Sequence, residues 1–140
     1  MLTEGDKMPN VSVEDDRGQR VETADLLGGR LVLYFYPKDD TPGCTIEASQ
    51  FRDLLPQFER KKARVVGVSR DPVASHQEFK KKYSLPFELL SDVDSTLYDA
   101  FGVSGRSTFV IDETGKIVKI WPKVTAEGHA REVLEYLSTE

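Results

Sequence analysis

Residues 31–48 of the chain read LVLYFYPKDDTPGCTIEA, and this segment decides the fold. Its first six residues form a continuous apolar run that ends at Pro37, which predicts a strand buried on both faces. After a polar loop, apolar residues recur at helical spacing, namely Ala48, Phe51, Leu55 and Phe58. A buried strand followed by a loop and an amphipathic helix indicates an α/β protein.

The remaining sequence continues this alternation. Strands are expected at residues 63–68, 87–90, 108–111 and 117–121, and helices at 72–83, 96–101 and 126–137. Near the N-terminus, turn residues between two short alternating segments, 11–13 and 20–22, predict a β-hairpin. We therefore expect one domain over residues 1–140, with a mainly parallel central sheet, an antiparallel edge and helices on both faces.

Composition narrows the classes of function. Nineteen Lys and Arg against twenty-four Asp and Glu give a formal charge of -5, which argues against nucleic acid or an anionic membrane as the main partner. No apolar run approaches the roughly 18 residues of a membrane span. The start, MLTEGDKMPN, lacks the pattern of a secretory signal. These observations predict a cytoplasmic protein.

Cys44 is the single cysteine of the chain, so an internal disulfide is impossible. Free cysteines are commonly buried and inert. However, Cys44 follows Pro42 and Gly43, where a loop after a strand enters a helix. Backbone amides at such a position stabilise an anion, including a thiolate. The position alone leaves both an inert and a reactive thiol open.

Pro37, Thr41 and Cys44 match the pattern Pro-x-x-x-Thr/Ser-x-x-Cys. The surrounding loop resembles the active-site loop of the peroxiredoxins, and it is most similar to the PrxQ branch, also called bacterioferritin comigratory protein. The resemblance covers nearly the whole chain, including segments 51–53, 66–69, 85–87, 89–92 and 106–112 and the residues Ser75, His76 and Phe79. It implies a thioredoxin-like fold and a thiol-dependent peroxidase, with no bound cofactor, that reduces hydrogen peroxide and small organic hydroperoxides through a sulfenic acid.

The resemblance also implies roles for the site residues: Cys44 is the peroxidatic cysteine, Thr41 and Arg106 are its partners, and Pro37 is its shield. Lowering a cysteine pKa from about 8.5 to about 6 requires roughly 3.4 kcal/mol. A helix N-terminus typically supplies about 0.3 to 1 kcal/mol. A nearby guanidinium is therefore needed, and Arg106 is the candidate.

A lower pKa also reduces the nucleophilicity of the thiolate, so ionisation alone gives a small net gain in rate. We expect the site to position the peroxide and to stabilise charge on its leaving oxygen. Thr41, Arg106 and the Gly43 and Cys44 amides are candidates for this work. The Thr41 hydroxyl is expected to donate to the thiolate while it accepts from the peroxide, or simply to cap the helix.

Two further candidates for substrate contact are Glu47 and Tyr36. Glu47 lies one turn into the expected helix, where it either orients Arg106 or complements the helix dipole. Tyr36 is expected to belong to the core and to the wall of the pocket. The two alternatives for Glu47 remain open from the sequence.

The chain departs from the family at Ser49. In many PrxQ-like proteins a resolving cysteine lies five residues after the first, and here that residue is serine. The resemblance then implies resolution by an external thiol, such as thioredoxin, glutaredoxin or a small thiol. A natural one-Cys enzyme and a laboratory Cys-to-Ser replacement both explain Ser49. The alternative to turnover is a redox sensor or interaction module in which Cys44 is oxidised once.

No metal site is expected. His76 and His129 are the two histidines, and the sequence has neither an H-E-x-x-H nor a Cys-x-x-Cys motif. Both histidines are interpreted as ordinary helix residues. The expected oligomeric state is a monomer or a weak homodimer.

Overall fold

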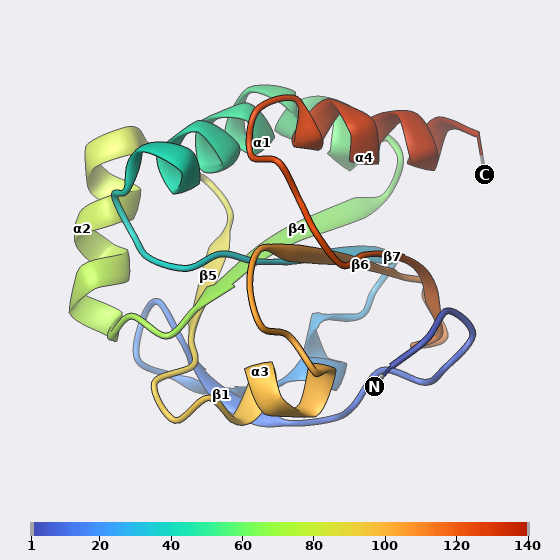
Figure 1. The fold of residues 1–140 in the computed structure, drawn as a ribbon, viewed down its shortest axis with the longest axis horizontal. Coiled ribbons are helices and arrows are strands. Elements are labelled where there is room, and N and C mark those ends of the chain that lie inside the picture. Colours follow the sequence, from blue (N-terminus) through green and yellow to red (C-terminus); the bar gives the residue numbers. More distant parts are fainter. Residues whose placement is uncertain (1, 140) are drawn as a thin grey trace.

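The computed structural model of the protein describes residues 2–139. Within them, strands form one sheet in the order β2-β1-β5-β4-β3-β6-β7, and helices pack on both of its faces (Figure 1). The strands are β1 (Ser12–Asp15), β2 (Arg20–Glu22), β3 (Arg30–Phe35), β4 (Ala63–Ser69), β5 (Glu88–Ser91), β6 (Ser107–Ile111) and β7 (Ile117–Trp121). The helices are η1 (Thr23–Leu26), α1 (Pro42–Arg60), α2 (Val73–Tyr83), α3 (Thr96–Phe101) and α4 (His129–Ser138). The expected α/β class is confirmed.

The strand β3 lies inside the sheet and contributes to two separate cores. Its even-numbered side chains, with those of α1, α2 and α4, form one cluster, and its odd-numbered side chains pack with α3 and β1 in the other. Every residue from Leu31 to Phe35 is fully buried. Alternate side chains of a strand point to opposite faces, so the apolar run 31–36 is needed because helices cover both sides (Figure 1).

The sheet contains more antiparallel pairing than the sequence predicted. Its centre is parallel as expected, because β3 pairs in parallel with β4, and β4 pairs in parallel with β5. The strand β6, however, runs antiparallel to β3 within the sheet, and the N-terminal hairpin is antiparallel to β5. The preceding helix α3 has 6 residues, a length of about 9 Å. This is too short to return the chain along the sheet, so β6 enters from the opposite end.

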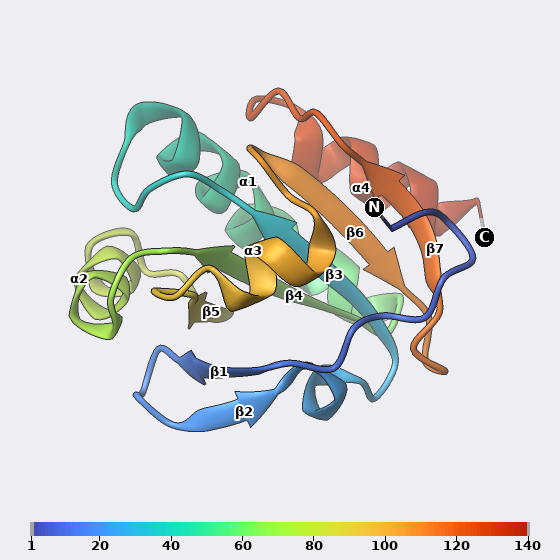
Figure 2. The same cartoon turned by 60° about the horizontal axis from the view of Figure 1, so that its bottom comes forward.

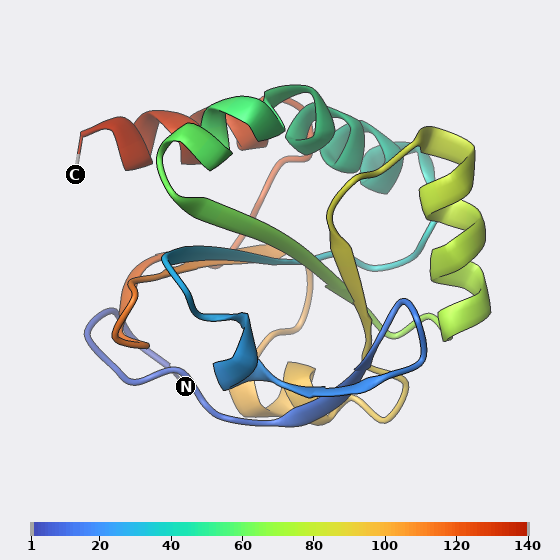
Figure 3. The same ribbon diagram turned by 180° about the vertical axis from the view of Figure 1, so that it is seen from behind.

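Both expected hairpins are present. The β1–β2 and β6–β7 pairs are antiparallel, and Figure 2 shows them on opposite sides of the central strands. Seen from behind, η1 lies across the sheet from α1 and α4 (Figure 3). The last helix begins at His129 rather than near residue 126, because Gly128 adopts a φ of 84° at its N-cap. Among residues 2–139, no helix combines the length and apolarity needed to cross a membrane.

Candidate active site

Cys44 lies in the first turn of α1, directly after the loop that leaves β3. Thr41 is the N-cap residue in an extended conformation, and Pro42 occupies the first helical position, where its missing N–H is no loss. The Cys44 residue is 1% exposed. The amides of this first turn have no partner within the helix. The thiol is thus buried in a position that favours a negative charge.

Arg106 contacts the sulfur directly. Its Nη2 donates to Sγ of Cys44 at 3.4 Å, and its Nη1 donates to Oε1 of Glu47 at 2.6 Å. The register that pairs Ser107 with Phe35 places Arg106 beside the end of β3. The expected thiol–guanidinium pair is therefore present. Arg106 directly precedes β6, a strand in the interior of the sheet.

Glu47 is joined to Arg106, which is the contact that one of its two sequence-based alternatives requires. Its side chain is fully buried and forms an ion pair with the guanidinium. Burial raises the pKa of Glu47 to about 7, and the charge of Arg106 acts in the opposite direction. Burial also works against the charge of Arg106, but Glu47 and the Cys44 sulfur outweigh it, so the pKa of Arg106 is raised. The pair keeps a cation at the thiol.

The second oxygen of Glu47, Oε2, is buried without a hydrogen-bond partner among the described residues. The buried hydroxyl of Tyr34 likewise has none, and burial followed by the nearby Glu47 charge raises the pKa of Tyr34 well above its usual value. Glu47 therefore holds the guanidinium through one oxygen only. Its free oxygen disfavours the charged carboxylate, in agreement with the raised pKa.

Gly43 allows the guanidinium to approach the helix. A Cβ at this position would lie 3.1 Å from Nη2 of Arg106, which is closer than ordinary van der Waals contact. The sequence predicts a role for Gly43 through its backbone amide. The structure adds a steric reason for glycine at this position.

The hydroxyl of Thr41 donates to the carbonyl oxygen of Lys38 at 2.9 Å. It makes no side-chain capping bond, so the capping alternative is wrong. A hydroxyl has one proton, so it cannot donate to the thiolate in this arrangement. Its oxygen can still accept a hydrogen bond from a substrate.

Tyr36 and Pro37 differ in their surroundings. The Tyr36 ring is buried in the same core cluster as Cys44, as expected, and its hydroxyl donates to Oδ1 of Asp39 at 2.6 Å. Pro37 lies on the exposed side of the loop. A direct substrate contact by Tyr36 and shielding by Pro37 stay predictions. Ser49 is half-buried farther along α1.

A pocket of about 510 Å³ lies beside Arg106, between the segment that precedes β6 and the segment that follows β7. It is lined by residues 104–106 and 122–125. Arg106 is one of the lining residues, so the pocket adjoins the residue that contacts the Cys44 sulfur. This pocket was not expected from the sequence, because residues 122–125 carry no motif.

Sequence reasoning also missed a buried polar network next to the site. Asp39, Asp71 and His76 bring their ligand-type atoms within 4.8 Å of one another. The three residues come from the β3–α1 loop, the β4–α2 loop and α2. No local sequence pattern therefore predicts that they meet. Their polar atoms already bond to each other and to Ser69, Ser75 and Leu90. The atoms that a metal would need are thus occupied by hydrogen bonds.

The fold and the thiol–guanidinium pair together define a thiol-dependent peroxidase of thioredoxin-like architecture. Comparison with known proteins leads to the same class. Residues 4–120 match a family model described as the AhpC/TSA family. The chain belongs to this family, the peroxiredoxins.

Its relatives carry the names Bcp and peroxiredoxin Q. The chain is 42% identical over 146 residues to peroxiredoxin Bcp of Bacillus subtilis, which covers 95% of this chain and 93% of the relative. It superposes on a Cys-to-Ser mutant of Xylella fastidiosa PrxQ with a TM-score of 0.94 at 40% identity, covering 99% and 97% of the two chains. Mycobacterium tuberculosis BcpB gives a TM-score of 0.93 at 34% identity, covering 99% and 98%. The expected family, fold and peroxidase activity are confirmed.

Proposed function

We propose that Cys44 is the nucleophile and that Arg106 stabilises the breaking O–O bond. The thiolate attacks one peroxide oxygen, the O–O bond breaks, and the sulfur becomes a sulfenic acid. The second oxygen leaves as water, or as an alcohol from an organic hydroperoxide, after it takes a proton. The observation that supports this assignment is the contact of Arg106 with Sγ at 3.4 Å while Glu47 holds its other nitrogen at 2.6 Å.

The remaining site residues have positioning roles in this proposal. The Thr41 oxygen accepts from the peroxide O–H, since its own proton is donated to the Lys38 carbonyl. The Gly43 and Cys44 amides and Arg106 bind the developing negative charge. Glu47 fixes the guanidinium, the Tyr36 ring forms part of the wall, and Pro37 limits access of water to the sulfenic acid.

We propose that an external thiol completes the cycle. Cys44 is the one cysteine of the chain and Ser49 stands at the family's resolving position, so no intrachain disulfide can form. A first external thiol condenses with the sulfenic acid to give a mixed disulfide and water. A second thiol then releases Cys44 by exchange. Thioredoxin, glutaredoxin or a small thiol can supply both, and such donors fit an antioxidant role in the cytoplasm.

Stopped-flow mixing of the reduced protein with hydrogen peroxide tests the assignment. Cys44→Ser is expected to abolish peroxide consumption, and retained turnover would end the proposal. Oxidation that stops after one equivalent, with excess thiol donor present, would instead favour a redox sensor. A steady turnover with thioredoxin or a small thiol supports the enzyme.

Arg106→Ala separates the two effects of the guanidinium. Measured at a pH where the thiol is fully ionised in both proteins, the variant is expected to react with peroxide about a hundredfold more slowly. Arg106→Lys keeps a positive charge but lacks the two nitrogens that bind Glu47 and the Cys44 sulfur separately. It should recover only part of the rate with peroxide. Equal rates for wild type and Arg106→Ala at that pH would show that the residue acts on ionisation alone.

A further inference from the structure

His76 is buried at the start of α2 with both ring nitrogens engaged. Its Nδ1 lies 2.6 Å from Oδ2 of Asp39, and its Nε2 lies 2.9 Å from the carbonyl oxygen of Leu90. The side chain is 0% exposed. An interior imidazole with two fixed partners differs from the ordinary helix histidine that the sequence predicted.

The partners define the protons on the ring. A backbone carbonyl only accepts hydrogen bonds, so Nε2 carries a proton. The Asp39 carboxyl already accepts from the Tyr36 hydroxyl at 2.6 Å and from the Ser75 hydroxyl at 2.8 Å. With those donors in place, Nδ1 serves as a further donor to a carboxylate. A ring that donates from both nitrogens is an imidazolium.

The charged and titratable groups around the ring agree with a cation. They are the Asp39 carboxylate of the β3–α1 loop, the Asp71 carboxylate of the β4–α2 loop and the Tyr36 hydroxyl at the end of β3. One oxygen of Asp71, Oδ2, accepts two hydrogen bonds, from the Asp39 amide at 2.8 Å and from the Ser69 hydroxyl at 2.7 Å. Two acidic side chains therefore lie next to the ring.

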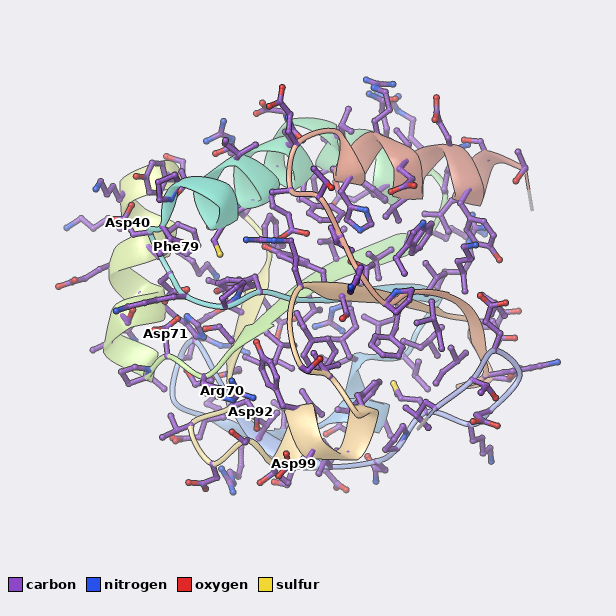
Figure 4. The ribbon with its side chains drawn as sticks, viewed as in Figure 1. Asp40, Arg70, Asp71, Phe79, Asp92 and Asp99 are labelled. Carbon is purple, nitrogen blue, oxygen red and sulfur yellow. The ribbon has the colours of Figure 1, made fainter. Side chains whose placement is uncertain are left out.

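Asp39 belongs to the loop that leads from β3 to Cys44. The next residue, Asp40, has a φ of 60° and bonds to Lys82 at 2.8 Å and to the Tyr83 hydroxyl at 2.5 Å. Both partners lie on the last turn of α2, and Figure 4 shows Asp40 in the loop next to this helix. The loop is thus bonded to α2 twice, by Asp39 in the interior and by Asp40 at the surface.

We propose that His76 is a positioning residue for the peroxidase reaction. As an imidazolium it bonds Asp39 to α2 and β5, and so fixes the loop that carries Thr41 and precedes Cys44. The interior bond is the stronger of the two attachments, because it joins buried charges, whereas the Lys82–Asp40 pair is exposed to solvent. This inference rests on the proposed function of Cys44.

Nitrogen NMR of the unmodified protein tests the charge of the ring. At neutral pH we expect two protonated ring nitrogens for His76. His129 is the other histidine of the chain and serves as the internal control, since burial lowers its pKa and it should be neutral. A His76 spectrum with one unprotonated nitrogen would overturn the proposal without any variant.

Two variants separate the two bonds. In His76→Asn the side-chain amide nitrogen occupies the place of Nδ1 and can keep the bond to Asp39, whereas in His76→Gln it reaches the place of Nε2 and keeps the bond to Leu90. The readout is the ratio of the rate with hydrogen peroxide to the rate with iodoacetamide. Alkylation needs the thiolate but no peroxide positioning, so a general loss of reactivity cancels in this ratio.

We expect His76→Gln to lower this ratio by about tenfold to a hundredfold, and His76→Asn to stay within a few-fold of wild type. An unchanged ratio in His76→Gln, or equal losses in both variants, would overturn the positioning role. If the wild-type protein reacts with peroxide no faster than a free thiol, the proposed function fails instead, while the NMR result for His76 still stands on its own.

Discussion

At the level of single residues, the Glu47 carboxyl connects catalysis to stability. Its pKa rises from 4.5 to about 7 on folding because it is buried. A raised acid pKa means that the folded state holds the proton more tightly than the unfolded chain. The contribution of the protonated Glu47 carboxyl to the free energy of unfolding is fully present below about pH 4.5. It is lost as the pH rises to about 7. The predicted loss from this group is about 3 kcal/mol.

Glu47→Gln should remove that loss. The difference in unfolding free energy between mildly acidic and mildly basic buffer, measured with urea, should shrink relative to wild type. Glu127→Gln, at an exposed glutamate, is the control and should leave the pH dependence unchanged. An identical pH dependence for Glu47→Gln and wild type would contradict the raised pKa.

Gly43 provides a second prediction at the residue scale. Alanine suits a helix better than glycine, but a Cβ here would press on Nη2 of Arg106 at 3.1 Å. Gly43→Ala should therefore retain or raise the melting temperature while the rate with hydrogen peroxide falls about tenfold. Gly28→Ala, where no atom lies within 4 Å of the added carbon, is the control. A Gly43→Ala protein with full activity would show that the guanidinium can shift without cost.

At the level of elements, α1 determines how Cys44 can be resolved. The helix is continuous from Pro42 to Arg60, so Cys44 and Ser49 share one regular segment. Five helical residues rise about 7.5 Å, beyond the roughly 7 Å at which two Cα atoms can be bridged by a disulfide. A bridge between these positions requires the first turn of α1 to unwind.

Ser49→Cys tests this requirement. One equivalent of peroxide should produce an intrachain disulfide in the variant, detected as a mass loss of two hydrogens, together with reduced helical circular dichroism. The unsubstituted chain, treated in the same way, should show a sulfenic or sulfinic acid at Cys44 and unchanged helix content. A disulfide formed with full helix content would contradict the geometric argument.

The elements also show what the sequence could predict. The strand β3 was located within one residue at each end, and the helix α1 was recognised without bounds, because both faces of β3 and one face of α1 are apolar. The direction of β6 was missed, since it depends on the length of α3 rather than on any pattern in β6. The start of α4 was placed too early, because the left-handed conformation of Gly128 is a tertiary feature.

The site was predictable to the extent that its residues lie in one segment or match a family motif. Cys44 and Arg106 are brought together as expected, and Glu47, whose role was left open, joins them. The proton of Thr41 was assigned to the wrong acceptor, because the turn that presents the Lys38 carbonyl forms only in the folded loop. The Asp39–His76 bond joins residues 37 positions apart, and no one-dimensional signal links them.

At the scale of the whole molecule, the two cores leave little apolar surface for a partner. Among the described residues, Ile46 at 41% and Val93 at 58% are the exposed large hydrophobic side chains. They belong to α1 and to the loop after β5, and isolated exposed residues of this kind do not form the extended patch of a stable interface. This surface predicts a monomer or at most a weak homodimer.

Sedimentation velocity at micromolar concentration should give the mass of a single 15.8 kDa chain, in both the reduced protein and the peroxide-treated protein. Ile46 lies two residues after Cys44 and is the candidate contact if a weak dimer forms. In that case Ile46→Glu should restore the monomer, whereas Val93→Glu should not, which would place the interface over the first turn of α1. A stable dimer that persists in both variants would show that a polar surface, rather than these side chains, mediates association.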